Sequence, residues 1–185
     1  MDSRKAYVLG LFAGDGWFES RGVTIGTTSE SFASKIKQVM EQTFNKHIVL
    51  KPRIYKDGHK MFLVSLHSKE ICEEFKQILQ TSKKKSTTFK IPEMTTEQKR
   101  SFVAGLFDAE GYTYLWKRKT PRVSMEIFHE TASKFVQDVL LKDGIKGFVS
   151  KCGDGGFKFD VTGEKYILAL FKLYPFLKLC PPCAG

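Results

Sequence analysis

The stretch Val103–Gly111 reads V-A-G-L-F-D-A-E-G, and Val8–Gly16 reads V-L-G-L-F-A-G-D-G. The two copies share valine, glycine, leucine and phenylalanine in register. Each ends in an acid followed by glycine, with Asp15 in the first copy and Glu110 in the second. An internal repeat indicates two similar structural units. The chain is therefore predicted to fold as two related halves, each of which places one carboxylate at the same position.

The predicted secondary structure has the same order on both sides of this repeat. Apolar residues at helical spacing, alternating segments and turn signals such as Asp57-Gly58 predict helix, two strands, helix, two strands and helix in each half. In the second half we expect a turn at Thr120-Pro121 and a helix over Thr131–Leu141. The fold class is α+β, with eight antiparallel strands in one sheet or two related sheets and the helices on one face. The predicted domains are a first half at residues 1–82, a linker at 83–96 and a second half at 97–185.

The charge of the chain indicates a polyanionic partner. Its 185 residues include 30 Lys and Arg against 20 Asp and Glu, a formal net charge of +10. An excess of this kind is typical of nucleic-acid-binding proteins. No apolar run approaches the roughly 20 residues that span a bilayer, so we expect an intracellular protein with no membrane contact. A single C-x-x-C, Cys180 to Cys183, is a weak zinc signal without a second pair.

The repeated stretch also predicts how the halves join. Small residues four apart lie on one helix face and let two helix backbones approach closely; the expected interface residues are Gly10, Gly14, Gly105 and Ala109. Such packing would bring the helix C-termini together, and with them Asp15 and Glu110. Two carboxylates at one point, supplemented by the carbonyls of Gly14 and Ala109, favour Mg²⁺. Metal ions between two acids suit in-line phosphodiester displacement. In the first copy of the repeat, Ala13 occupies the position that corresponds to Asp108. Asp108 therefore has no acidic counterpart and is expected to be a structural hydrogen-bonding residue.

The chain resembles the LAGLIDADG homing endonucleases of the single-chain, two-motif type, on the two nine-residue stretches quoted above. The resemblance spans nearly the whole chain. It implies two antiparallel four-stranded sheets related by a pseudo-twofold axis, which form a saddle along the DNA major groove. It implies a monomeric, intron-encoded enzyme that cuts both strands of a long site, leaves 3′ overhangs and needs no protein partner. By resemblance Asp15 and Glu110 bind the catalytic ions, with Mg²⁺ as cofactor, Mn²⁺ supporting activity and Ca²⁺ binding without cleavage.

The resemblance also implies a basic residue near each scissile phosphate. The segment 174–178 resembles the one that carries it in the second half, which makes Lys178 the candidate. In the first half the matching place is the run Lys83–Lys85, where Lys84 or Lys85 is expected and Lys85 is the candidate. Family members often hold the attacking water with a polar residue at the end of the second strand, a place where His129 stands here.

Strand alternation assigns one sheet face to the helices and the other to DNA. Arginines on such strands can read guanine, and lysines contact phosphates. The unlike residues of the two halves predict an asymmetric target. The expected DNA-facing residues are Glu19, Arg21, Thr24, Thr28, Lys51, Arg53 and Tyr55 in the first half, and Tyr114, Trp116, Arg118, Arg122, Ser124, Glu126, Ser150 and Lys158 in the second.

Two other functions suit the same fold. One is an RNA-binding maturase that assists intron splicing, and the other is a DNA-binding regulator that lacks the chemistry. Retention of both Asp15 and Glu110 argues against the regulator. It does not separate a nuclease from a protein that is both nuclease and maturase.

Overall fold

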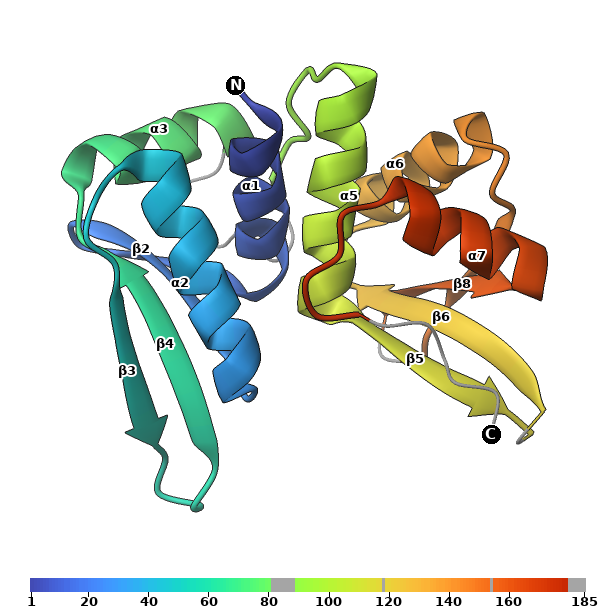
Figure 1. Ribbon diagram of the computed structural model, residues 1–185, viewed down its shortest axis with the longest axis horizontal. Coiled ribbons are helices and arrows are strands. Elements are labelled where there is room, and N and C mark those ends of the chain that lie inside the picture. The colour runs from blue at the N-terminus through green and yellow to red at the C-terminus, as the bar shows by residue number, and fades with distance from the viewer. Residues whose placement is uncertain (81–88, 118, 154, 180–185) are drawn as a thin grey trace.

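A computed structural model describes residues 1–80, 89–117, 119–153 and 155–179 (Figure 1). The candidates Lys85 and Arg118, the neighbouring Lys83 and Lys84, and the pair Cys180 and Cys183 lie outside these residues. Within the described part of the chain, no helix is both long enough and apolar enough to cross a lipid bilayer.

Both halves have the expected order of elements. The first comprises α1 (Ser3–Asp15), β1 (Gly16–Glu19), β2 (Gly22–Thr27), α2 (Glu30–Phe44), β3 (Val49–Ile54), β4 (Lys60–Leu66) and α3 (Lys69–Leu79). The second comprises α5 (Thr96–Glu110), β5 (Gly111–Trp116), β6 (Thr120–Ile127), α6 (Glu130–Lys142), β7 (Gly147–Lys151), β8 (Phe157–Thr162) and α7 (Glu164–Leu173).

The strands form two antiparallel four-stranded sheets, one in each half. The strand orders are β1-β2-β4-β3 and β5-β6-β8-β7, so the second sheet repeats the topology of the first. In Figure 1 the helices lie on one side of both sheets, α1 and α5 stand side by side at the centre, and the sheets diverge below them. The α+β fold class, the duplication and the central helix pair are confirmed, and the chain has two sheets rather than one.

Side-chain caps fix where most helices begin. Asp2, Ser29, Ser68 and Thr95 each accept a hydrogen bond from a backbone N–H in the first turn of the following helix. These bonds satisfy donors that have no partner inside the helix. The expected start of the helix at Thr131 was wrong, because the cap of α6 is His129, whose Nδ1 accepts from the N–H of Ala132.

The turn between β5 and β6 also differs from the expectation. Thr120 and Pro121 belong to β6, and the strands are joined around Lys117, which has a φ of 52°. Pairing of β6 with β8 begins at Arg122, so among the described strands Pro121 pairs with β5 alone. A proline tolerates this position because no hydrogen bond to a second neighbouring strand is needed there.

The two sheet faces have different compositions because side chains alternate along each strand. Val23 and Ile25 of β2, with Val64 and Leu66 of β4, are at most 1% exposed and face the helices. In the second half Val123, Met125, Phe159 and Val161 do the same. Because the helices of the described chain lie on one side, the opposite face of each sheet is open, and these two open faces form the saddle (Figure 1).

Candidate functional site

The central helices α1 and α5 contact each other backbone to backbone. A Cβ built on Gly10 would lie 2.1 Å from the carbonyl oxygen of Phe102, and one on Gly105 would lie 2.2 Å from that of Tyr7. No side chain fits at either distance, so each glycine permits the close approach of the opposite helix. The structure thus places Gly10 and Gly105 in the helix interface, reciprocally across the pseudo-twofold axis.

The same helices also meet at their C-terminal ends. A Cβ on Gly14 would lie 2.4 Å from the Cβ of Ala109 and 3.5 Å from Oε1 of Glu110. The last turn of α1 is therefore in contact with the last turn of α5, and the Glu110 carboxylate lies over Gly14. Asp15 follows Gly14 directly as the last residue of α1. The two acids of the repeat are therefore the terminal residues of two helices whose ends touch.

Each acid lies where a helix passes directly into a strand. The helix α1 ends at Asp15 and β1 begins at Gly16, and α5 and β5 join in the same way at Glu110 and Gly111. Both glycines have extended backbones, with φ of −96° and −95°, so their conformation does not require glycine. Glycine is required here because there is no room for a side chain. A Cβ on Gly16 would lie 2.3 Å from the Phe12 ring, and one on Gly111 would lie 2.3 Å from the Phe107 carbonyl oxygen. This glycine lets the chain turn from helix to sheet immediately after the acid.

The donors at this point fit a hard divalent cation. They are carboxylate and carbonyl oxygens, and a side chain at Gly14 would fill the space beside Glu110. Among the described residues, no cluster of three or more His, Cys, Asp and Glu side chains could hold a metal ion alone. Mg²⁺ is commonly bound through one or two carboxylates, with water and substrate phosphates supplying the other ligands.

A lysine from the end of the chain reaches the same point. Nζ of Lys178 donates a hydrogen bond of 3.3 Å to the carbonyl oxygen of Ala109 and lies 5.7 Å from the ring centroid of Phe32. Ala109 was expected to supply that oxygen to a metal ion, so a positive charge already stands at the expected ligand. Lys178 is exposed and next to the acid pair, a position from which it could contact a bound phosphate.

The residue that holds the Lys178 segment is Asp108. Its carboxylate is fully buried and accepts hydrogen bonds from the hydroxyl of Tyr7 and from the backbone N–H groups of residues 177–179. The negative charge and burial together raise the pKa of Tyr7 well above its usual range, with burial the larger cause. Asp108 is a hydrogen-bonding residue inside the fold, as the sequence indicated.

The open face of the first sheet is partly apolar. Trp17 and Met61 cover Gly26, whose Cβ would lie 3.1 Å from the Trp17 ring and 2.7 Å from the Met61 sulfur. Nε1 of Trp17 donates to Glu19 over 2.7 Å, and the Arg53 guanidinium lies 4.8 Å from the Tyr55 ring centroid. The exposed members of the predicted set on this half are Glu19, Arg21, Thr28, Lys51 and Arg53, with Tyr55 half-buried.

The open face of the second sheet carries a polar network. The Tyr112 hydroxyl donates to Glu126 over 2.6 Å, and Nζ of Lys158 lies 3.7 Å from Glu126 and 5.4 Å from the Tyr112 and Tyr114 ring centroids. The hydrogen bond with Tyr112 raises the pKa of Lys158 above its usual range, so this lysine is charged at neutral pH. Toward the hairpin tip, Lys117 and Arg122 place cations 4.3 Å and 4.5 Å from the Trp116 ring centroid. Ser150 is exposed on β7, opposite Lys158.

Two predicted DNA-facing residues are corrected by the structure. Thr24 is 1% exposed and its hydroxyl is 2.9 Å from that of Ser65, while Ser124 is 0% exposed and donates to Asp160. Both lie on the predicted face, but in central strands where neighbouring side chains cover them. Their hydroxyls bond within the sheet and are not available to DNA.

The predicted DNA-facing set omitted several residues of the open faces, including Met61 and Tyr112 as well as Trp17, Asp160 and Phe148. Trp17 pairs with Thr24 across β1 and β2, and Asp160 and Phe148 pair with each other across β8 and β7. Phe148 is 66% exposed. The signal was present in the sequence, since Asp160 is two residues from Lys158 and Phe148 two residues from Ser150, both already assigned to this face.

The structure gives His129 a role in the fold. Its Nδ1 caps α6, and its ring lies 4.6 Å from that of Phe89, which is 2% exposed. Burial lowers the pKa of His129, which keeps the ring neutral and able to accept the capping bond. Phe89 belongs to the expected linker, so the described end of that segment packs against the second half.

Comparison with known proteins agrees with this architecture. A family model for the LAGLIDADG-like domain matches residues 2–80 and again residues 97–173. A search of curated proteins finds no match.

Solved structures resemble the chain over most of its length. Structures of mesophilic variants of the homing endonuclease I-DmoI match with a TM-score of 0.66 and 18% identity over 92% of this chain and 94% of that one. I-DmoI in complex with DNA and Ca matches with a TM-score of 0.65 and 18% identity, over 95% and 93% of the two chains. Full-length DUF199/WhiA from Thermatoga maritima matches with a TM-score of 0.68 and 15% identity over 96% of this chain, but 57% of its own. At these identities the likeness shows the fold.

Proposed function

Because the chain belongs to the family of LAGLIDADG-like domains, we propose that it is a site-specific, intron-encoded endonuclease that cuts both strands of DNA and leaves 3′ overhangs. The observation that carries the proposal is the pair of acids, Asp15 and Glu110, at two touching helix ends between two open sheet faces. An acid at a helix C-terminus is unfavourable, because this end carries partial negative charge.

The parts of the fold take separate tasks in this proposal. The open sheet faces bind a DNA major groove, and their charged and aromatic side chains contact bases and phosphates. Asp15 and Glu110 are the residues that would hold Mg²⁺. The bound ions would lower the pKa of the attacking water and stabilise the leaving oxygen. Lys178 supplies a positive charge at the same place, close to where negative charge develops.

The unlike sheet faces support an asymmetric target. The first face has Trp17 and Met61 over Gly26, and apolar contacts of this kind suit the methyl group of thymine. The second face has Glu126, Lys158 and Arg122, which suit hydrogen bonds to cytosine and guanine. One domain of 185 residues with both halves in one chain can read such a site as a monomer.

The alternatives are a DNA-binding regulator and an RNA-binding maturase on the same fold. Fold likeness does not separate them from a nuclease, since DUF199/WhiA resembles the chain as closely as I-DmoI does. The acid pair favours the nuclease. Binding alone requires no carboxylates at the centre of a surface that faces a polyanion, where they would repel phosphates.

The test is to incubate the protein with a randomised duplex library and Mg²⁺, and to sequence the cut ends. We expect one asymmetric sequence with short 3′ overhangs. Asp15→Asn and Glu110→Gln should each abolish cutting of that site and leave binding in Ca²⁺ largely intact, because the sheet faces supply most of the contacts to bases and phosphates. Glu93→Gln, an exposed acid that precedes the opposite, N-terminal end of α5, is the matched control. Binding without any cutting by the unchanged protein would favour the regulator, and selective binding of RNA would favour the maturase.

A further inference from the structure

Asp108 joins three parts of the molecule by hydrogen bonds. Its Oδ2 accepts from the Tyr7 hydroxyl over 2.7 Å and from the N–H of Leu177 over 2.5 Å. Its Oδ1 accepts from the N–H groups of Lys178 and Leu179 over 3.0 and 2.8 Å. We call these four bonds the Asp108 latch. It ties α5 of the second half to α1 of the first half and to the segment that carries Lys178.

The latch is a strong constraint because the acid is completely buried. Asp108 is 0% exposed, and an uncompensated charge there would be very costly. Four donors surround its two oxygens, and three of them are consecutive backbone N–H groups. Hydrogen bonds to an ionised group are stronger than neutral ones. One carboxylate therefore binds three consecutive backbone N–H groups, those of residues 177–179.

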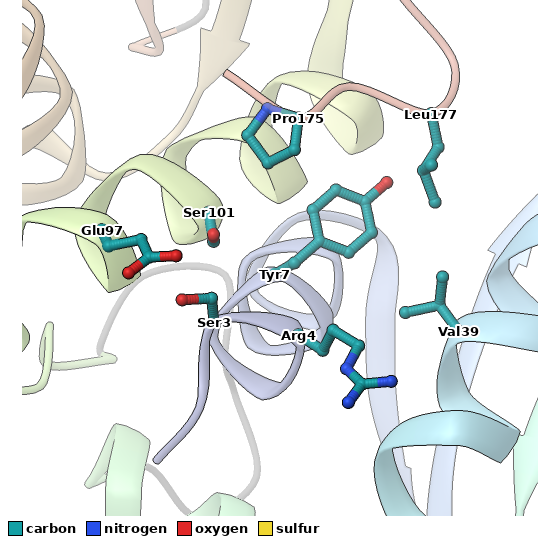
Figure 2. A pocket seen from close by; sticks show the side chains of 8 residues that line it. All are labelled: Ser3, Arg4, Tyr7, Val39, Glu97, Ser101, Pro175 and Leu177. Carbon is teal, nitrogen blue, oxygen red and sulfur yellow. The ribbon is translucent and has the colours of Figure 1, made fainter. Parts of the chain in front are cut away.

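Side-chain packing contributes less on this side of the segment. Tyr7 and Leu177 border a pocket of about 280 Å³ that also involves Val39 and Pro175 (Figure 2). Figure 2 shows the Tyr7 ring pointing toward the C-terminal segment that carries Pro175 and Leu177. Leu177 and Leu179 pack partly against the core, and Nζ of Lys35 donates to the Leu177 carbonyl oxygen over 2.8 Å. The hydrogen bonds to Asp108 are the contacts that fix the backbone N–H groups of residues 177–179.

The position of Lys178 follows from the latch. Its backbone N–H is the middle one of the three donors, and its side chain extends to the Ala109 carbonyl, next to Glu110. We propose that Asp108 is a positioning residue that acts through Lys178 and sets the rate at which one of the two DNA strands is cut. This inference rests on the proposed endonuclease function.

The repeat supplies the reason for expecting an effect on one strand. In the first copy Ala13 stands at the place of Asp108, and in the second copy Phe102 stands at the place of Tyr7. Neither member of the Tyr7–Asp108 pair therefore has a counterpart across the pseudo-twofold axis. Because Ala13 carries no carboxylate, the first half cannot build the same latch at the matched position. Loss of Asp108 should displace the basic residue of the second half alone.

The experiment measures the cutting rate of each strand with separately end-labelled duplexes under single-turnover conditions. Asp108→Asn keeps the size of the side chain but replaces one acceptor oxygen by a donor. We expect Asp108→Asn to slow one strand by about 10- to 100-fold, as misplacement of a catalytic group by about 1 Å does, and to leave the other within about threefold. Lys178→Met should slow the same strand. The double variant should be no slower than Lys178→Met, because one residue acts through the other.

Several outcomes would overturn the inference. In the first, Asp108→Asn slows the cutting of both strands equally. In the second, Asp108→Asn and Lys178→Met slow different strands. In the third, the effects of the two variants multiply in the double variant. Tyr7→Phe removes the bond between the helices but keeps the three bonds to residues 177–179, so it should shift the strand ratio much less than Asp108→Asn does. A shift as large as that of Asp108→Asn would assign the effect to helix packing. If Asp108→Asn does not fold, Asp108→Ala, which copies the first-half residue, replaces it.

A second measurement needs no cleavage. Amide hydrogen exchange at residues 177–179 should be faster in Asp108→Asn than in the unchanged protein, while exchange in α2 stays the same. Unchanged exchange at 177–179 would show that Asp108 does not hold the segment. If the unchanged protein cuts no duplex, the proposed function fails, and the exchange result still decides whether Asp108 positions Lys178.

Discussion

The ammonium group of Lys178 donates a hydrogen bond of 3.3 Å to the main-chain carbonyl oxygen of Ala109, one residue before Glu110. A flexible side chain from the end of the fold thus reaches the point where the ends of α1 and α5 meet. It brings a positive charge to the place where two helices end in the acids Asp15 and Glu110. This geometry distinguishes Lys178 from the many lysines on the outer surface.

Replacement of Lys178 by Met should slow DNA cutting by about 10²-fold, the usual effect of removing one group that stabilises charge in a transition state. The Kd for the target in Ca²⁺ should change by less than about threefold. Lys165→Met, on the exposed surface of α7, is the matched control and should change neither quantity. Lys178→Met could instead weaken binding as much as cutting and reduce the slope of log K against log salt concentration by about one. In that case the lysine only contacts a DNA phosphate and does not contribute to catalysis.

Replacement of Gly10 by Ala should force α1 and α5 apart. The new Cβ would lie 2.1 Å from the Phe102 carbonyl oxygen, and backbone cannot move aside as a side-chain tip can. We expect a loss of about 3 kcal/mol in the free energy of unfolding, at the upper end of overpacking effects, measured by urea denaturation. Gly153→Ala is the control, because a Cβ added to Gly153 would have nothing within 4 Å. Equal stabilities of the two variants would contradict the close helix contact.

The ion pair between Arg100 and Asp143 should stabilise the second half. The guanidinium donates to both Asp143 oxygens over 2.9 and 2.6 Å, and the Tyr174 hydroxyl donates over 2.8 Å. Asp143→Asn should lower the free energy of unfolding by about 2 kcal/mol, and Tyr174→Phe by about 1 kcal/mol.

The same pair should give a dependence on pH. The hydrogen bond from Arg100 lowers the pKa of Asp143 in the folded state. The stabilisation is therefore complete above the unfolded pKa of about 4 and is lost as pH falls through the folded pKa. The difference between the unchanged protein and Asp143→Asn should be constant from neutral pH to about pH 5 and shrink below about pH 4. A constant difference at lower pH would show that the charge of Asp143 is not involved.

The cap of α6 should weaken in mild acid. Burial lowers the pKa of His129 in the folded state, so its stabilising effect is present above the unfolded pKa of about 6.5 and is lost as pH falls through the folded pKa. Protonation removes the lone pair with which Nδ1 accepts from Ala132. His129→Asn keeps a capping acceptor that does not titrate. Between pH values of about 7.5 and 5.5 the Tm of the unchanged protein should fall relative to that of His129→Asn, whereas parallel curves would argue against the cap.

The sequence by itself determined the duplication, the order of elements and the position of one acid at the end of each repeated helix. Gly10 and Gly105 at matched positions indicated a close helix contact, and the acid before each final glycine indicated where the helices end. These features are local or repeated, so spacing along the chain is enough to reveal them. Alternation likewise assigned most side chains of each strand to the correct sheet face.

Only the tertiary structure decided which of those side chains are accessible and what holds the end of the chain in place. Thr24 and Ser124 have the correct alternation, but neighbouring strands cover them, and no pattern within one strand shows its neighbours. The Asp108 latch joins residues 7, 108 and 177–179, which are far apart in the sequence. A buried carboxylate is satisfied by whichever donors the fold brings to it, so its partners, and the position of Lys178 that depends on them, follow from packing rather than from any motif.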